Sequence, residues 1–103
     1  MIRLIKCKRK ENKLNACFLY NNDNNPMIRR LIDISSEDCI KFTADVYVAF
    51  DQYSNCKPYS VEFKREDCES IYSRFNHYNK LIEKCFSELL LTLAVINAHP
   101  FIR

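Results

Sequence analysis

The chain has 103 residues, a formal net charge of +3 and 48% hydrophobic residues, which is enough for one folded domain with its own core. It contains no glycine. This excludes phosphate-binding glycine-rich loops, dinucleotide fingerprints and nucleophile elbows, because all of them need glycine where the backbone approaches a ligand or takes a positive φ. We therefore expect a single domain over residues 1–103 that is not an enzyme and uses no cofactor.

Five segments have the character of β-strands. Residues 2–9 and 14–20 are short apolar stretches joined by a polar turn, and residues 27–34 follow an Asn-rich loop with an ambiguous period. Residues 40–50 form the clearest strand, because β-branched and aromatic side chains alternate along the whole segment. Apolar and polar side chains alternate again over residues 59–63. The sequence therefore predicts an antiparallel meander of four or five strands within residues 1–63.

The remainder of the chain has the pattern of one long helix. Between residues 66 and 98 apolar side chains recur alternately three and four positions apart, as at the a and d positions of four heptads. Acidic residues in the first turn complement the helix dipole, and Pro100 ends the helix. We expect an α+β fold in which the sheet is followed by a long C-terminal helix over residues 64–99.

From Cys85 onward this helix is apolar on nearly every side, and such a helix is buried. It could lie under the sheet of its own chain, or it could pair with the same helix of a second subunit. We favour a homodimer, because the sheet of so small a domain is expected to cover only part of the helix. The expected interface consists of Ile82, Cys85, Phe86, Leu89, Leu93 and Ile96.

Basic residues gather near the start of the chain. Residues 1–30 hold eight basic and two acidic side chains, whereas the remaining residues hold eight basic and eleven acidic ones. Such segregation creates a local positive field that suits a phosphate backbone. Sheet aromatics beside basic residues can stack on single-stranded bases, and we place Phe18, Tyr20, Tyr47, Tyr53 and Tyr59 on or beside strands. The expected nucleic-acid-binding residues are Arg3, Lys6, Lys8, Arg9, Lys10, Lys13, Arg29, Arg30 and Tyr47.

An acidic protein surface is the alternative partner for this basic region. In that case the chain would be an interaction protein, for instance a viral or phage factor that binds and inhibits a host or defence complex. An enzyme is less well supported. Asp45 and Asp51 lie six residues apart, about 20 Å along a strand, which is too far for an acid/base pair, and His77 has no apparent catalytic partner.

The cysteines and the apolar segments indicate in which cellular compartment we expect the protein. The six cysteines include no Cys-x-x-Cys pair, and the two histidines have no zinc-finger spacing, so no metal site is expected. The first residues are interrupted by charge too early for a signal peptide, and residues 89–96 are too few to span a bilayer, which needs about 20 apolar residues. We expect reduced thiols in a cytoplasmic or nuclear protein without membrane attachment.

The second half of the chain resembles one known family. The segments Val46–Tyr53, Lys57–Phe63 and Lys64–Ile71 follow one another as strand, loop, short strand and acidic helix start. This order is similar to the end of the positive-cofactor-four family of transcriptional coactivators. The resemblance covers roughly residues 40–82 and implies a curved antiparallel sheet with one helix, a dimer, and binding of single-stranded DNA. The glycines and the early helix tryptophan of that family are absent, so no site residue is carried over from it.

Overall fold

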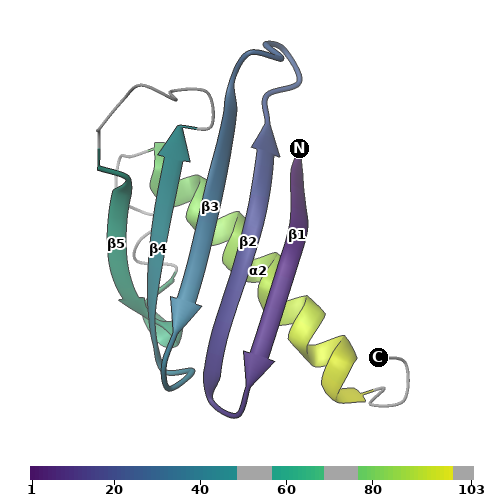
Figure 1. Ribbon diagram of the computed structural model, residues 1–103, viewed down its shortest axis with the longest axis vertical. Coiled ribbons are helices and arrows are strands. Elements are labelled where there is room, and N and C mark those ends of the chain that lie inside the picture. Colours follow the sequence, from purple (N-terminus) through teal and green to yellow (C-terminus); the bar gives the residue numbers. More distant parts are fainter. Residues whose placement is uncertain (49–56, 69–76, 99–103) are drawn as a thin grey trace.

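The computed structural model describes residues 1–48, 57–68 and 77–98, and within the last range the side chains of residues 78–94. The strands are β1 (Ile2–Lys10), β2 (Lys13–Asn21), β3 (Arg29–Ser36), β4 (Lys41–Val48) and β5 (Tyr59–Lys64). They form one antiparallel sheet in the order β1-β2-β3-β4-β5, and helix α2 (His77–Ala98) lies across one face of it (Figure 1). The predicted α+β meander with a C-terminal helix is confirmed.

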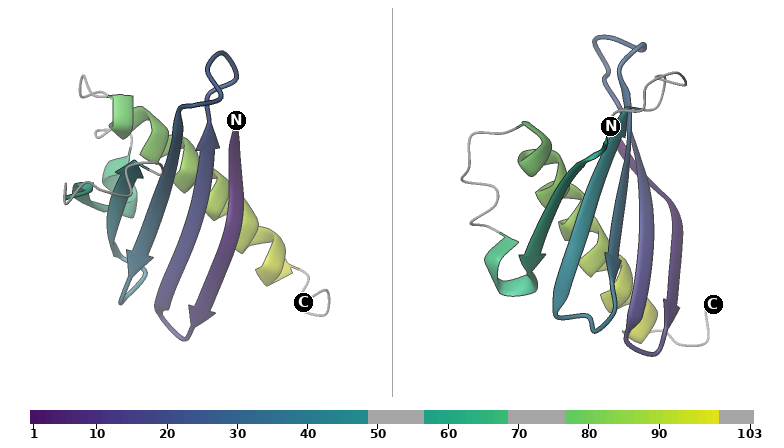
Figure 2. Two further views of the ribbon diagram at one scale, coloured as in Figure 1. Left: turned by 45° about the horizontal axis from the view of Figure 1, so that its top comes forward. Right: turned by 60° about the vertical axis from the view of Figure 1, so that its left-hand side comes forward.

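The sheet is covered by α2 on one side only, which is clearest in the views of Figure 2. We call the side that α2 covers the helix side, and the other side, which no described helix covers, the open face. Alternation along the strands produces this division, because successive side chains of a strand point to opposite faces. On β2, for example, Leu14, Ala16 and Phe18 are buried on the helix side, whereas Asn15 and Cys17 between them are half-buried.

Aromatic rings pack α2 against strands β4 and β5. Phe86 of α2 meets Phe42 and Phe63 edge-on at centroid distances of 4.9 and 5.1 Å, and the latter two rings stack at 5.7 Å. Such pairs contribute about 0.5–1.5 kcal/mol beyond the area that they bury. Ile32 and Ile34 of β3 are also fully buried in this core. The core therefore lies between the sheet and one face of α2.

The structure places most of the expected dimer interface inside the chain. Ile82, Cys85 and Leu89 are 0% exposed and Phe86 is 1% exposed, all within the core of the single chain. Leu93 packs partly against the same core, and the side chain of Ile96 lies outside the described residues. The four buried side chains have no surface left for a second subunit, so their assignment to an interface is wrong. The homodimer itself stays a prediction.

The sheet covers more of the helix than we expected because the helix crosses it obliquely (Figure 1). The 22 residues of α2 span about 33 Å at 1.5 Å per residue. Five strands are about 19 Å across at about 4.8 Å per step, and an eight-residue strand is about 27 Å long, so the diagonal reaches about 33 Å. The predicted helix over 64–99 begins later, because Lys64 belongs to β5 and Arg65–Asp67 form a 3-10 turn. Its residues 69–76 and 99 lie outside the described ranges.

The turns between the strands form without glycine. In the Asn-rich loop the side-chain oxygen of Asn22 accepts hydrogen bonds from the backbone N–H groups of Asn24 and Asn25 at 2.9 and 3.1 Å. In the part of the chain that the structure describes, two non-glycine residues take the left-handed conformation at turns, Glu11 with φ 57° and Cys39 with φ 60°. Side-chain hydrogen bonds hold the first of these turns. In the others, non-glycine residues adopt the positive φ that such turns usually assign to glycine. Across the described ranges, no helix combines the length and hydrophobicity that a membrane crossing needs.

Candidate nucleic-acid interface on the open face

Four of the predicted basic residues lie together on the open face of β1. Lys8 and Lys10 pair with Asn15 and Lys13 of β2, so their side chains share the face opposite to that of the buried β2 residues. Lys6 pairs with Cys17 and Arg3 with Leu19, on the same face. All four cations are exposed. No ion pair joins any of them to a carboxylate in the ranges that the structure describes.

An irregularity in β1 brings Arg3 into this group. The register shifts between Leu4 and Lys6, as at a β-bulge, and Ile5 is the residue without a cross-strand partner. An unbroken alternation would place Arg3 and Lys6 on opposite faces, because they are three residues apart. The unpaired Ile5 shifts the alternation of the strand by one residue, so the cations before and after it all lie on the open face of the edge strand β1.

A row of side chains crosses the open face from this edge toward β4. The cross-strand partners Arg3, Leu19, Leu31 and Tyr47 stand side by side on four consecutive strands. Leu19 and Leu31 are half-buried, and Tyr47 is 40% exposed. Three steps of about 4.8 Å separate the ends of the row by about 14 Å. The row therefore offers a cation at one end, an apolar middle and an aromatic ring at the other end.

The open face is divided in charge. The strand residues of β1 and β2 that face this way include five cations and no carboxylate, whereas β3, β4 and β5 contribute three cations and the three acids Asp33, Asp45 and Glu62. Asp33 accepts a 2.7 Å hydrogen bond from the side-chain amide of Asn15. Burial of the phenol, together with the charges of Asp45 and Asp33, raises the pKa of Tyr47. A polyanion is thus favoured along β1 and disfavoured near the acids.

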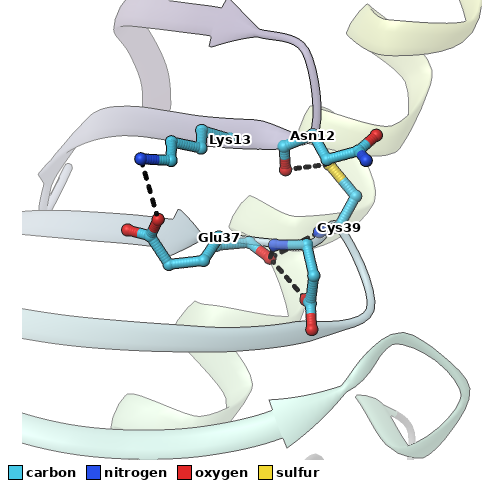
Figure 3. Close-up of polar contacts among 6 residues, drawn as sticks. Asn12, Lys13, Glu37 and Cys39 are labelled. Carbon is cyan, nitrogen blue, oxygen red and sulfur yellow. Dashed lines mark hydrogen bonds and ion pairs between the residues drawn. The ribbon is translucent and has the colours of Figure 1, made fainter.

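Lys13, at the start of β2, is partly neutralised. Its ammonium lies 3.5 Å from the carboxylate of Glu37 in the β3–β4 turn, and both side chains are largely exposed (Figure 3). Such a surface pair contributes about 0–1 kcal/mol. The same two turns are linked by the Cys39 thiol, which donates to the carbonyl oxygen of Asn12 at a sulfur–oxygen distance of 3.1 Å. Lys13 is therefore a weaker phosphate ligand than its neighbours on β1.

Two predicted basic residues do not join the open face. Arg9 pairs with Leu14 and Arg30 with Tyr20, which places both side chains on the helix side. Arg29, the partner of Asn21, does face the open side. For Arg9 and Arg30, assignment to one surface with the β1 lysines is wrong, because neighbouring residues of a strand point to opposite faces.

The predicted aromatic platform is smaller than expected. Phe18 is fully buried, and Tyr20 and Tyr59 lie half-buried on the helix side, which leaves Tyr47 on the open face. Tyr53 lies outside the described residues. Leu19 and Leu31 were not among the predicted residues, although both fall on the alternate positions of strands whose other positions are apolar. Large apolar residues on the polar face of a strand were the available signal.

The described residues contain no group of three or more His, Cys, Asp or Glu side chains that could hold a metal ion. No protein-family model, curated protein or solved structure matches the chain.

Proposed function

We propose that the open face of the sheet binds single-stranded nucleic acid. The phosphate backbone follows the basic side chains of β1, and bases lie on the apolar row formed by Leu19, Leu31 and Tyr47. The observation that carries the proposal is the row of four exposed cations on one edge strand, Arg3, Lys6, Lys8 and Lys10, without a carboxylate partner among the described residues.

The chemistry of the two parts is complementary. Lysine and arginine along an edge neutralise phosphates and release counterions, which supplies affinity without sequence preference. A neighbouring apolar and aromatic surface accepts the faces of unpaired bases, whereas in a duplex those faces are stacked inside. Both parts lie on one chain, so the proposed binding does not need a second subunit.

The salt dependence of binding tests the proposal. The intact protein is titrated with labelled DNA and RNA strands of about 20 nucleotides at several salt concentrations. If four cations each neutralise a phosphate, the logarithm of the affinity falls against the logarithm of salt with a slope of about −2.8. Replacing Lys8 and Lys10 with Gln reduces this slope to about −1.4.

The base platform is tested separately. Tyr47→Ala should weaken binding by about 1–3 kcal/mol at every salt concentration and leave the slope unchanged, because a stacked ring carries no charge. Failure of the intact protein to bind either strand at about 50 mM salt, where phosphate contacts are strong, would overturn the proposal. The basic edge would then suit an acidic protein surface, as in the alternative function.

A further inference from the structure

The oblique path of α2 leaves one corner of the helix side open. This corner holds the start of β1, the end of β2 and the start of β3, and it lies near the N-terminus in Figure 1. Here a cleft with a cavity volume of about 1060 Å³ separates the sheet from the first turns of α2. Ligand pockets commonly enclose about 300–1,000 Å³, so this cleft is large enough for a small molecule.

The floor and the wall of the cleft come from different elements. Ile2, Tyr20 and Arg30 are cross-strand partners on β1, β2 and β3, and they form a row across the floor. Lys80 and Lys84 stand on one side of α2, because residues four positions apart in a helix are neighbours. The cleft thus brings together a guanidinium from the sheet and two ammonium groups from the helix.

The charged side chains that line the cleft, among the described residues, are all basic. Arg30, Lys80 and Lys84 all line it, and no Asp or Glu does so among its described lining residues. The Nε–H group of Arg30 is buried and has no hydrogen-bond partner, while one terminal nitrogen donates to the carbonyl oxygen of Arg29 at 2.8 Å. A buried donor is rarely left without an acceptor in a native protein, so the site lacks an acceptor next to this arginine.

Three tyrosines also line the cleft. Tyr20 lies in the floor, and Tyr59 and Tyr78 form one end with a ring-centroid distance of 5.4 Å. The hydroxyl of Tyr59 donates to the side-chain oxygen of buried Asn79 at 2.7 Å, which fixes the ring at the junction of β5 and α2. Aromatic rings held in place in this way accept a planar group by stacking or edge contact.

We propose that this cleft binds a nucleoside phosphate. The phosphate lies between Arg30, Lys80 and Lys84, because a dianion can accept hydrogen bonds from several cations at once, and the planar base lies against the tyrosines. The ligand is either a free mononucleotide or the 5′-phosphorylated end of a strand. This inference does not depend on the proposed function, because the cleft and the basic edge are on opposite faces of the sheet.

Calorimetric titration with AMP, adenosine and ribose 5-phosphate tests the proposal on the full chain. AMP should bind with a dissociation constant below about 1 mM. It should bind at least about tenfold more tightly than either fragment, because each fragment lacks one half of the ligand. In heteronuclear NMR spectra, AMP should shift the backbone signals of Tyr20, Arg30 and Leu81 and leave those of Lys8 and Thr43 unchanged.

Lys84→Gln provides the matched variant, since this side chain is exposed and its loss should not disturb the core. It should weaken AMP binding about tenfold by removing a charged contact, whereas Lys8→Gln on the open face should have no effect. Absence of saturable AMP binding would overturn the proposal. So would equal affinity of AMP for the protein and for Lys84→Gln, or tighter binding of decanoate, an apolar carboxylate, than of AMP.

Short strands distinguish the two sources of the ligand. A 5′-phosphorylated trinucleotide that binds about tenfold more tightly than AMP, and loses this advantage without its phosphate, identifies a strand end. A trinucleotide that binds no more tightly than AMP identifies the free nucleotide. Lys84→Gln should weaken binding in both cases.

Discussion

Truncation of Leu89 distinguishes a core position from a subunit interface. Leu89 lies in α2 and is 0% exposed in the single chain. Leu→Ala substitutions at such positions cost about 2–5 kcal/mol, from lost burial and the cavity that remains. A loss of about 3 kcal/mol should lower Tm by roughly 12–24 °C, because each kcal/mol corresponds to about 4–8 °C in a domain near this size.

The assay is urea and thermal unfolding of Leu89→Ala at two protein concentrations, with the molar mass measured by light scattering. Leu91→Ala is the control, since Leu91 lies two residues further along α2 and is 63% exposed. It should change stability by less than about 0.5 kcal/mol. Leu89 is not a core residue if Leu89→Ala retains the stability of the original protein and only lowers its molar mass, which is the behaviour of an interface residue.

Three further substitutions or modifications probe the packing and the turns. Tyr59→Phe leaves the side-chain oxygen of buried Asn79 without its 2.7 Å hydrogen bond, so the free energy of unfolding, measured by urea titration, should fall by about 1–3 kcal/mol. The control is Tyr47→Phe, which removes a hydroxyl from an exposed ring and should be nearly neutral. Backbone N–H groups of Lys41 and Ile40 lower the pKa of Asp38, so its contribution to stability is present above the unfolded pKa near 4 and is lost as the pH falls through the folded value. Asp38→Asn should therefore lose less stability than the original protein between pH 7 and pH 3, as unfolding curves at both pH values can show. Burial, and secondarily the charge of Glu88, raises the pKa of Cys85 to about 12, so at pH 8 a thiol reagent should label Cys85 only as fast as the protein unfolds, which mass spectrometry of timed samples can follow. Labelling of Cys85 much faster than unfolding would contradict its placement in the core.

Much of the fold could be predicted because period-two alternation is a local signal. The strand predicted over residues 40–50 is observed as β4, Lys41–Val48, and its alternation gives the correct buried face; residues 49 and 50 lie outside the described ranges. The strand near residues 27–34 was ambiguous because it begins with a turn, and β3 runs instead from Arg29 to Ser36. Pairing with β2 and β4, which the sequence does not display, decides where such a strand begins and ends.

The site could be predicted only in part. Arg9 lies between Lys8 and Lys10, and strand alternation alone would have assigned it to the opposite face. The presence of Arg3 beside Lys6 could not be foreseen, because it depends on a β-bulge that has no clear sequence signal here. The burial of Leu89 under the sheet depends on the oblique crossing of α2, which is a property of tertiary packing.

The most direct test of the central claim compares Lys8→Gln with Arg9→Gln in binding to a single strand of about 20 nucleotides at low salt. The two residues are neighbours, and each substitution removes one positive charge, but their side chains lie on opposite faces of the sheet. We predict that Lys8→Gln reduces the slope against the logarithm of salt by about 0.7 and weakens binding, whereas Arg9→Gln leaves both nearly unchanged. Equal effects of the two substitutions would show that binding follows net charge, and would contradict recognition by the open face.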